Sequence, residues 1–397
     1  MMKILVINAG SSSLKYQLID MDGEIVLAKG ICERIGLEDG IFTHKANGNA
    51  WTTYPVMKNQ TEAFAQVKKA LTEGEGKVID DLSEVGAIGH RVVQGGDRFD
   101  RSVIVTEKVK QDIEELAALA PLHNMGALAG INAATETFGT EITQVVVFDT
   151  AFHQTMEQKV YMFALPYEYY EKYGVRRYGA HGTSHRFVSA RCTELLGKVE
   201  GTRIITCHLG SGSSISAIKD GKIYDTSMGL TPLDGFMMGT RTGGMDPSVV
   251  TYVMEKEGLT PKQMDDLMNK KSGTLGVSGV SSDDRDIEKA IGEGNARAKL
   301  AWDMRTYQIT KIIGGYIAAL GGLDALVFTA GIGENQPLVR KEIIDALAYM
   351  GMKCDAEANN VRGVERLITT EDSAIPAWII PTNEELVIAR DTLALAQ

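Results

Sequence analysis

Hydrophobic and polar residues follow the same order in two stretches of the chain that lie about 200 residues apart. Residues 4–15 read ILVINAGSSSLK and residues 204–215 read IITCHLGSGSSI, each an apolar run, a polar residue and a Gly-Ser-rich turn. Both continue into alternating positions, YQLID and SAIKD, and reach an Asp-Gly dipeptide at 22–23 and at 220–221. Asp-Gly between alternating apolar runs is a strong hairpin signal. The pattern therefore predicts two copies of a three-stranded antiparallel meander.

A different pattern of apolar and polar residues follows each meander and predicts strands that alternate with helices. Continuous apolar runs at 144–150 and 325–335 are typical of buried parallel strands. Helical spacing of apolar residues covers 61–71, 107–119, 184–196 and the long stretch from Asp286 to Leu320.

The repeat also places the domain boundary, because no Pro-rich linker or low-complexity segment interrupts the chain. A length of 397 residues favours two domains. We expect a first domain at 1–150 and a second at 151–385, which would contain nucleotide-binding elements. A C-terminal helix at about 386–397 is expected to pack on the first domain.

Charge and cysteine content narrow the range of functions. The formal net charge of −11 argues against binding of duplex nucleic acid, since such proteins carry a basic surface. The four cysteines lack CxxC or metal-ligand spacing, so reduced thiols are expected. No apolar run approaches the roughly 20 residues of a membrane span, and the first residues lack the apolar length of a secretory signal. We expect a cytoplasmic protein that binds neither nucleic acid nor membrane.

The Gly-Ser turns are the first candidate for binding chemistry. The segment NAGSSSLK at 8–15 fits neither the P-loop pattern GxxxxGK[ST] nor the dinucleotide pattern GxGxxG. A tight turn between two strands nevertheless presents backbone N–H groups and hydroxyls to phosphate oxygens. Two mixed sheets with such turns at the same edge would form a cleft that holds the phosphates of a nucleotide.

Motifs along the whole chain resemble, in the same order, those of the acetate kinase family: INAGSSSLK, RVVQGG, VVFDTAFH, RRYGAHGTSH, CHLGSGSS, MGTRTGGMDP, FTAGIGEN and PTNEEL. The resemblance implies an α/β fold shared with sugar kinases, actin and the large heat-shock chaperones. In that fold ribonuclease-H-like domains, each a mixed sheet flanked by helices, are duplicated around an active-site cleft. It also implies a homodimer that transfers a phosphoryl group in line from ATP to acetate, giving acetyl phosphate and ADP reversibly, with Mg²⁺ or Mn²⁺.

Four polar residues in these motifs are candidate catalytic groups. Arg91 and Arg241 lie in Gly-rich segments and suit bidentate binding of carboxylate or phosphoryl oxygens. Asp149 ends an apolar strand, where α/β sites gather, although it could also cap the following turn. The resemblance makes these three residues and His181 catalytic. Because acetate is already ionised, we expect Asp149 to orient a metal-bound water or an arginine and not to act as a base.

The resemblance assigns further residues by their place in the motifs. Acetate would be held by Arg91 between Val93, Leu122 and Pro232. Asn8 and Glu384 would hold the metal. The nucleotide would contact Ser11, Ser13, Lys15, His208, Leu209, Gly210, Ser211, Gly212, Asp283, Asp284, Arg285, Gly331, Ile332, Gly333, Glu334 and Asn335. Lys15, taken alone, could equally be a solvated lysine on a strand.

Two local features give more specific expectations. Thr382 and Glu385 fit a capping box, which would leave Glu384 free to bind metal. Ala180 stands where many members of the resembling family have phenylalanine. Unless a neighbour fills the space, the smaller side chain should leave room for propionate beside acetate.

Other functions stay open on the sequence. One alternative is a propionate or butyrate kinase. Another is an ATPase switch like actin or the chaperones, which has no need of paired arginines for a carboxylate. ADP formation that depends on acetate would separate these functions.

Overall fold

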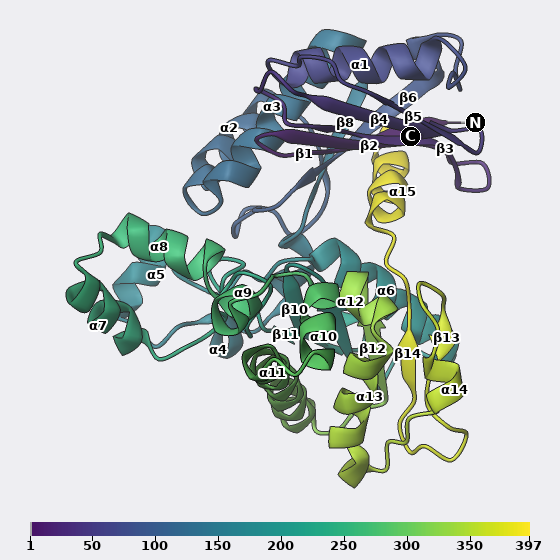
Figure 1. Cartoon of the computed structure of the whole chain (residues 1–397). Helices are drawn as coiled ribbons and strands as arrows, with labels where there is room; N and C mark the ends of the chain where they lie inside the picture. Colours follow the sequence, from purple (N-terminus) through teal and green to yellow (C-terminus); the bar gives the residue numbers. More distant parts are fainter. Residues whose placement is uncertain (1) are drawn as a thin grey trace. The chain divides into compact units, whose positions relative to one another are not determined.

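The computed structural model describes residues 2–397, without the side chains of Pro121 and Leu122, and divides the chain into two compact units (Figure 1). The first unit contains the chain up to Phe152 together with Asn383–Gln397, and the second unit contains His153–Thr382. No helix in the described part of the chain is long and apolar enough to cross a membrane.

The first unit is built on a mixed sheet in the order β5-β4-β3-β2-β1-β6-β8-β7. Its strands are β1 (Lys3–Ala9), β2 (Ser13–Asp20), β3 (Ile25–Glu33), β4 (Ile41–Ala46), β5 (Asn49–Thr53), β6 (Val85–Val92), β7 (Val103–Ile104) and β8 (Thr143–Phe148). Its α-helices are α1 (Gln60–Thr72), α2 (Glu107–Glu115), α3 (Pro121–Phe138) and α15 (Glu384–Ala396).

Both faces of the central strand β1 are buried, which explains its continuous apolar sequence. Leu5 packs with Phe64 of α1 on one face, and Ile4 packs with Ile388 of α15 on the other. Burial of each such side chain stabilises the fold by about 1.5–3 kcal/mol. Figure 1 shows α15, in yellow, on the opposite side of the purple strands from α1. The C-terminal helix is therefore part of the first unit's core.

The second unit is built on a mixed sheet in the order β11-β10-β9-β12-β14-β13. Its strands are β9 (Arg203–Leu209), β10 (Ser213–Lys219), β11 (Lys222–Thr226), β12 (Ala325–Thr329), β13 (Arg366–Leu367) and β14 (Ala377–Ile379). Its α-helices are α4 (Gln158–Tyr161), α5 (Tyr167–Tyr173), α6 (Gly182–Leu196), α7 (Pro247–Glu257), α8 (Pro261–Lys270), α9 (Gly273–Ser278), α10 (Asp284–Gly292), α11 (Ala296–Leu320), α12 (Ala330–Asn335), α13 (Pro337–Ala346) and α14 (Ala356–Asn359).

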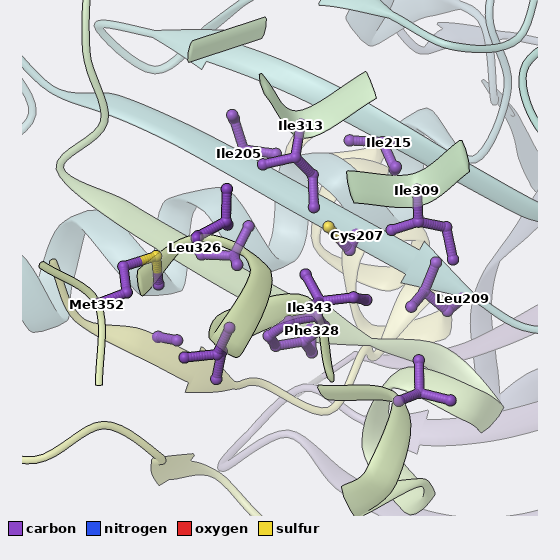
Figure 2. Close-up of a cluster of buried hydrophobic side chains, with 14 of the residues drawn as sticks. Ile205, Cys207, Leu209, Ile215, Ile309, Ile313, Leu326, Phe328, Ile343 and Met352 are labelled. Carbon is purple, nitrogen blue, oxygen red and sulfur yellow. The ribbon is translucent and has the colours of Figure 1, made fainter. Parts of the chain in front are cut away.

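The core of the second unit lies between the sheet and the helices that cover it. Cys207 of β9 and Phe328 of β12 point toward Ile313 of α11 and Ile343 of α13 (Figure 2). All four side chains are fully buried. This packing holds the ends of β9 and β12 side by side, and the predicted nucleotide-binding segments follow those ends.

The duplication extends beyond the predicted meander. The strand order β3-β2-β1-β6-β8-β7 in the sheet of the first unit corresponds to the order β11-β10-β9-β12-β14-β13 in the sheet of the second. In both, the meander strands pair antiparallel, the next two strands run parallel to the first, and the last is antiparallel. The predicted fold class, two mixed sheets flanked by helices, is confirmed. The first unit adds the hairpin β4–β5 at its edge.

Two expected elements are wrong in extent. The stretch from Asp286 to Leu320 is not one helix, because α10 ends at Gly292 and α11 begins after Asn295. The Asn295 side chain accepts hydrogen bonds from the first free N–H groups of α11, which fixes a new helix start there. The run at 325–335 is strand only as far as Thr329, and the glycine-rich remainder forms α12.

Candidate active site

Arg91 and Asp149 form the centre of a polar cluster in the first unit. Arg91 lies near the end of β6 and Asp149 directly follows β8, its parallel neighbour, so both side chains leave the same sheet edge. The guanidinium donates from Nε to Asp149 Oδ1 at 3.1 Å and from Nη2 to Oδ2 at 2.5 Å. The Asp149 side chain is only 1% exposed. Such a bidentate pair fixes the guanidinium plane.

Three other predicted residues complete this cluster. Asn8 Oδ1 lies 3.5 Å from Arg91 Nη1, and Glu384 Oε2 lies 3.8 Å from Arg91 Nε. Lys15 sits on β2 directly opposite Asn8 and lines the same small cavity as Glu384. The structure thus brings together residues that are separated by more than 370 positions in sequence.

Carboxyl groups outnumber cationic side chains in this cluster. Burial alone would lower the pKa of Arg91, but the carboxylates of Asp149 and Glu384 outweigh it and raise the pKa above the usual range. Burial raises the pKa of Glu384, Arg91 opposes the rise, and the charges of Asp149 and Glu385 add to it. Three carboxyl groups therefore face two cations, which makes a further cation favourable here.

The donor set of the cluster fits a hard divalent cation. An asparagine amide oxygen and one or two carboxylates are oxygen ligands of the kind that Mg²⁺ prefers, and Mg²⁺ keeps several waters or phosphate oxygens as its remaining ligands. Within the described residues no group of three or more His, Cys, Asp or Glu side chains is arranged to bind a metal on its own. Asn8 and Glu384 would therefore supply part of a coordination sphere.

The start of α15 differs from the predicted capping box. Asn383, not Thr382, is the N-cap, and its side chain accepts a hydrogen bond from Leu386 N at 3.1 Å. The expected Thr382–Glu385 box is wrong by one residue, because α15 begins at Glu384 and the residue that directly precedes it is Asn383. Glu385 instead lines the cavity beside Glu384. Both glutamates lie in the first turn, where the helix dipole favours negative charge.

The Gly-Ser turn of the first unit is closed by its own backbone. Gly10 N donates to Ser13 O at 2.8 Å, and Gln60 Nε2 donates to Gly10 O at 2.8 Å. Gly126 of α3 packs against the turn so closely that a Cβ there would lie 2.6 Å from Gly10 C. Ser11 is exposed at the tip and Ser13 is half-buried.

The predicted acetate wall is only partly described. Val93 is half-buried in the loop after β6, beside Gln94, whose Oε1 accepts from Gly96 N at 2.8 Å. The side chain of Leu122 lies outside the described residues. Pro232 belongs to the second unit, where its carbonyl accepts from Arg241 Nη1 at 3.1 Å.

His181 and Arg241 converge in the second unit. His181 precedes α6 with a left-handed backbone, φ 59°, which is uncommon for a residue other than glycine. A Cβ on Gly212 would lie 3.3 Å from Arg241 Nη1 and 3.6 Å from His181 Nε2. The absence of a side chain at Gly212 thus lets both groups approach the Gly-Ser turn. Burial lowers the pKa of Arg241.

Hydrogen bonds and ring stacking hold the imidazole of His181 in place. Its Nδ1 is bonded to Ser214 Oγ at 2.8 Å, and its ring stacks on His208 with the centroids 4.1 Å apart. His208 Nδ1 is bonded to Ser184 Oγ at 2.8 Å. These bonds join the end of β9, the start of β10 and the first turn of α6.

The glycine-rich segments at the ends of β9 and β12 meet, as their parallel pairing requires. A Cβ on Gly210 would lie 3.8 Å from Ala330 Cβ and 4.0 Å from Gly331 N, whereas one on Gly331 would meet nothing within 4 Å. Gly331 therefore borders open space. Leu209 is buried, Ser211 is exposed at the turn, Ile332 packs on the core, and Gly333 abuts Phe328.

Four polar side chains predicted to contact nucleotide are engaged within the protein. Glu334 Oε1 accepts from Ala330 N and Thr382 N, and Asn335 Nδ2 donates to Gly331 O. Asp283 caps α10 and pairs with the exposed Arg285. These contacts shape the loops and leave backbone groups to meet a ligand.

Asp284 departs from the expectation. Its carboxylate is buried in a bidentate ion pair with Arg305 of α11, and their side chains are 7% and 4% exposed. The side chain therefore ties α10 to α11 and does not face a ligand. The sequence offered no sign of this, because Arg305 lies 21 positions away within a helical pattern.

Known proteins match this chain over its whole length. The model of the acetokinase family matches residues 3–390. The chain is 52% identical over 400 residues to the acetate kinase of Thermotoga petrophila, covering 100% of this chain and 99% of that protein. It is 53% identical over 399 residues to the acetate kinase of Methanosarcina barkeri, covering 100% and 97%.

Solved structures give the same result. The crystal structure of Porphyromonas gingivalis acetate kinase matches with a TM-score of 0.96 at 47% identity, covering all of both chains. A propionate kinase from Francisella tularensis matches with a TM-score of 0.93 at 40% identity, again over all of both chains. With a family model that spans nearly its full length, the chain belongs to the acetokinase family.

Proposed function

We infer that the protein is an acetate kinase, which transfers the γ-phosphoryl group of ATP to acetate and gives acetyl phosphate and ADP, reversibly. The observation that carries this conclusion is the full-length similarity to acetate kinases at 52% identity. An acetate oxygen forms a bond to the γ-phosphorus while the bond to the β,γ-bridging oxygen breaks, and ADP leaves with that electron pair. Acetate is already ionised, so the nucleophile needs no base.

Catalysis of such a transfer depends on positioning and on neutralisation of charge. We propose that Arg91 binds the acetate carboxylate, with its plane set by Asp149. The two hydrogen bonds between them support this role, because they hold both Asp149 oxygens against the guanidinium and fix its plane. Asp149 is then a positioning residue.

Arg241 and His181 are proposed to face the transferring phosphoryl group. Their shared approach to the Cβ position of Gly212 supports this proposal, since both can direct N–H groups at one small anion. Removal of one donor of this kind typically costs about 10²–10³ in rate. The two Gly-Ser turns, Lys15 and the open backbone at Gly331 are proposed to hold the nucleotide.

Mg²⁺, when bound, would neutralise negative charge on the nucleotide phosphates. Asn8 and Glu384 are proposed to hold it directly or through water, and the uncompensated carboxylates of their cluster support this assignment. Mn²⁺, with similar ligand preferences, is expected to substitute.

The deciding experiment measures ADP formation with ATP, Mg²⁺ and a series of acids. The proposal requires little hydrolysis without acid and the highest kcat/KM with acetate. Highest activity with propionate would instead support a propionate kinase, the activity named for the relative at 40% identity. Hydrolysis indifferent to any carboxylic acid would support an ATPase switch. We also propose a homodimer, which light scattering would report as twice the chain mass of 43.1 kDa.

A further inference from the structure

A chain of three hydrogen bonds runs from His181 into the interior of the second unit. His181 Nδ1 is bonded to Ser214 Oγ at 2.8 Å, and the same oxygen is bonded to His185 Nε2 at 2.7 Å. His185 Nδ1 is in turn bonded to Thr206 Oγ1 at 2.7 Å. Ser214 and His185 are fully buried, so bulk water does not replace these contacts.

Local geometry explains why the chain of bonds exists. His185 lies on the first turn of α6, four residues after His181, so both rings lie on the same side of the helix start. Thr206 of β9 and Ser214 of β10 come from the strands that flank the second Gly-Ser turn. The bonds therefore tie the helix start to the phosphate-binding turn.

The bonds restrict where protons can lie. Ser214 has one hydroxyl hydrogen and two imidazole partners, so it can donate to only one of the two rings. Burial lowers the pKa of His185 well below its usual value, and the nearby His153 and His208 add to the effect. A neutral His185 carries one N–H, which couples its tautomer to the direction of the Ser214 hydroxyl.

Only one direction suits a donor role for His181. If His185 Nε2–H donates to Ser214, the serine hydroxyl donates to His181 Nδ1, and Thr206 donates to His185 Nδ1. A neutral His181 must then carry its hydrogen on Nε2, the atom beside Gly212 and Arg241. The opposite direction would put a lone pair on Nε2, which would repel a phosphoryl oxygen.

We propose that Ser214, held by His185, is a positioning residue that fixes His181 in the tautomer with hydrogen on Nε2. The proposal rests on the proposed function only for its consequence, because the tautomer is a property of the protein without substrate. It assigns a role to two residues that had none, although they close the motifs CHLGSGSS and RRYGAHGTSH: Ser214 and His185.

The test compares Ser214→Ala with Ser216→Ala. Ser216 lies two residues further along β10, is equally buried, and shares a 2.9 Å hydroxyl contact with Thr226 outside the chain of bonds. Each variant loses one buried hydroxyl from the same strand. Ser214→Thr keeps the hydroxyl and serves as the conservative variant. Thermal unfolding of all three establishes that they are folded.

The first readout is the ¹⁵N spectrum of histidine-labelled protein, in which long-range couplings distinguish the two neutral tautomers. His181 is assigned by its loss in His181→Ala. We expect the hydrogen on Nε2 in the unsubstituted protein, in Ser216→Ala and in Ser214→Thr, and a mixture of tautomers in Ser214→Ala. A hydrogen on Nδ1 in the unsubstituted protein, or an unchanged tautomer in Ser214→Ala, overturns the proposal.

The second readout is steady-state kinetics with acetate and ATP. Loss of one oriented donor should lower kcat about tenfold in Ser214→Ala, with both KM values nearly unchanged, and leave Ser216→Ala unaffected. Equal kcat losses in the two alanine variants would indicate a structural role only and overturn the proposal. If the protein showed no acetate-dependent activity, the proposed function would fail while the spectrum still decided the tautomer.

Discussion

Arg91 and Asp149 meet through two parallel hydrogen bonds, although 58 positions separate them in the chain. They meet because β6 and β8 are parallel neighbours whose ends fall at one sheet edge. A guanidinium bound on one edge by a carboxylate keeps its remaining N–H groups in a fixed direction. The pair is therefore a structural contact that also sets the direction in which Arg91 can donate.

Asp149→Asn should disrupt this pair while keeping its volume. Breaking a buried ion pair by removal of one partner costs about 3 kcal/mol of unfolding free energy. We expect kcat/KM for acetate to fall together with that stability. Asp112→Asn is the control, because its partner Arg98 is 40% exposed and such pairs contribute about 1 kcal/mol or less.

A double-substitution cycle then separates orientation from base catalysis. If Asp149 acts through Arg91, the activity losses in Arg91→Lys and Asp149→Asn should be strongly non-additive. Additive losses would mean that Asp149 acts on the reaction independently of Arg91.

Arg241→Ala should lower kcat by about 10²–10³ with a smaller change in the KM for ATP, because its contact strengthens as charge develops on the transferring group. The control is Arg191→Ala, which removes an exposed arginine of the same unit that is paired with Glu365. A raised KM for acetate at unchanged kcat would show that Arg241 only binds substrate.

Glu384 and Asn383 are adjacent, but their substitution by alanine should affect different properties, the metal requirement and the stability. Glu384→Ala should raise the Mg²⁺ concentration needed for half-maximal rate and leave the fold intact. Asn383→Ala removes the observed cap of α15 and should cost about 1 kcal/mol of unfolding free energy. Metal titration and urea unfolding of both variants provide the measurement. An unchanged metal requirement in Glu384→Ala would count against its assignment as a ligand.

His90 should make stability depend on pH. It is buried, bonded to Gln144, and burial lowers its pKa to about 4 despite that hydrogen bond. The folded state resists its protonation, so the contribution is complete above pH 6.5 and is lost as the pH falls toward 4. The loss amounts to about 3 kcal/mol.

Urea unfolding between pH 4 and 7 measures this contribution. His90→Gln should flatten the dependence in that range, whereas His123→Gln, at an exposed position, should not. An identical slope for the unsubstituted protein and His90→Gln would show that other groups control acid stability.

The sequence predicted those parts of the fold that local patterns determine. The meanders were found because Asp-Gly turns and alternation act over a few residues; in the structure Asp220 and Gly221 both have positive φ, as a tight hairpin requires. The apolar run at 144–150 predicted β8 as a buried strand, but no local pattern indicated how β6, β8 and β7 pair, because their pairing depends on packing between distant segments. The break between α10 and α11 was missed because Gly292 and Gly294 only weaken a helical pattern.

For the candidate site, motifs located residues but not their partners. Glu334 and Asp284 stood in expected segments, yet their carboxylates are taken by backbone N–H groups and by Arg305. Likewise, the motif CHLGSGSS includes Ser214 and not Ser216, but it did not indicate the partners of Ser214, and both serines are buried on one strand. The partner of a polar side chain depends on which other side chain lies next to it in the folded protein. Only the three-dimensional structure shows that neighbour.

Ala180 illustrates the same point and yields the last prediction. The smaller residue was expected to leave room for a longer acid unless a neighbour filled the space. In the structure Ala180 is buried in a cluster with Met228 and Met238. Met238 Sδ in turn lies 3.7 Å from Arg241 Nη1 and accepts from Ser213 N at 3.4 Å. The methionines therefore occupy the space next to Ala180.

Ala180→Phe should consequently overpack this cluster and displace Met238 toward Arg241. Overpacking costs about 1–3 kcal/mol, and the displaced arginine should lower kcat for acetate and propionate alike, without sharpening the choice between them. Met228→Ala in the same chain removes a comparable volume and should restore much of the lost stability and rate. The measurement is kcat/KM for both acids, with thermal unfolding, in the single and double variants. If Ala180→Phe leaves the acetate value intact and lowers only that for propionate, position 180 faces the acid and the methionine cluster is not its main contact.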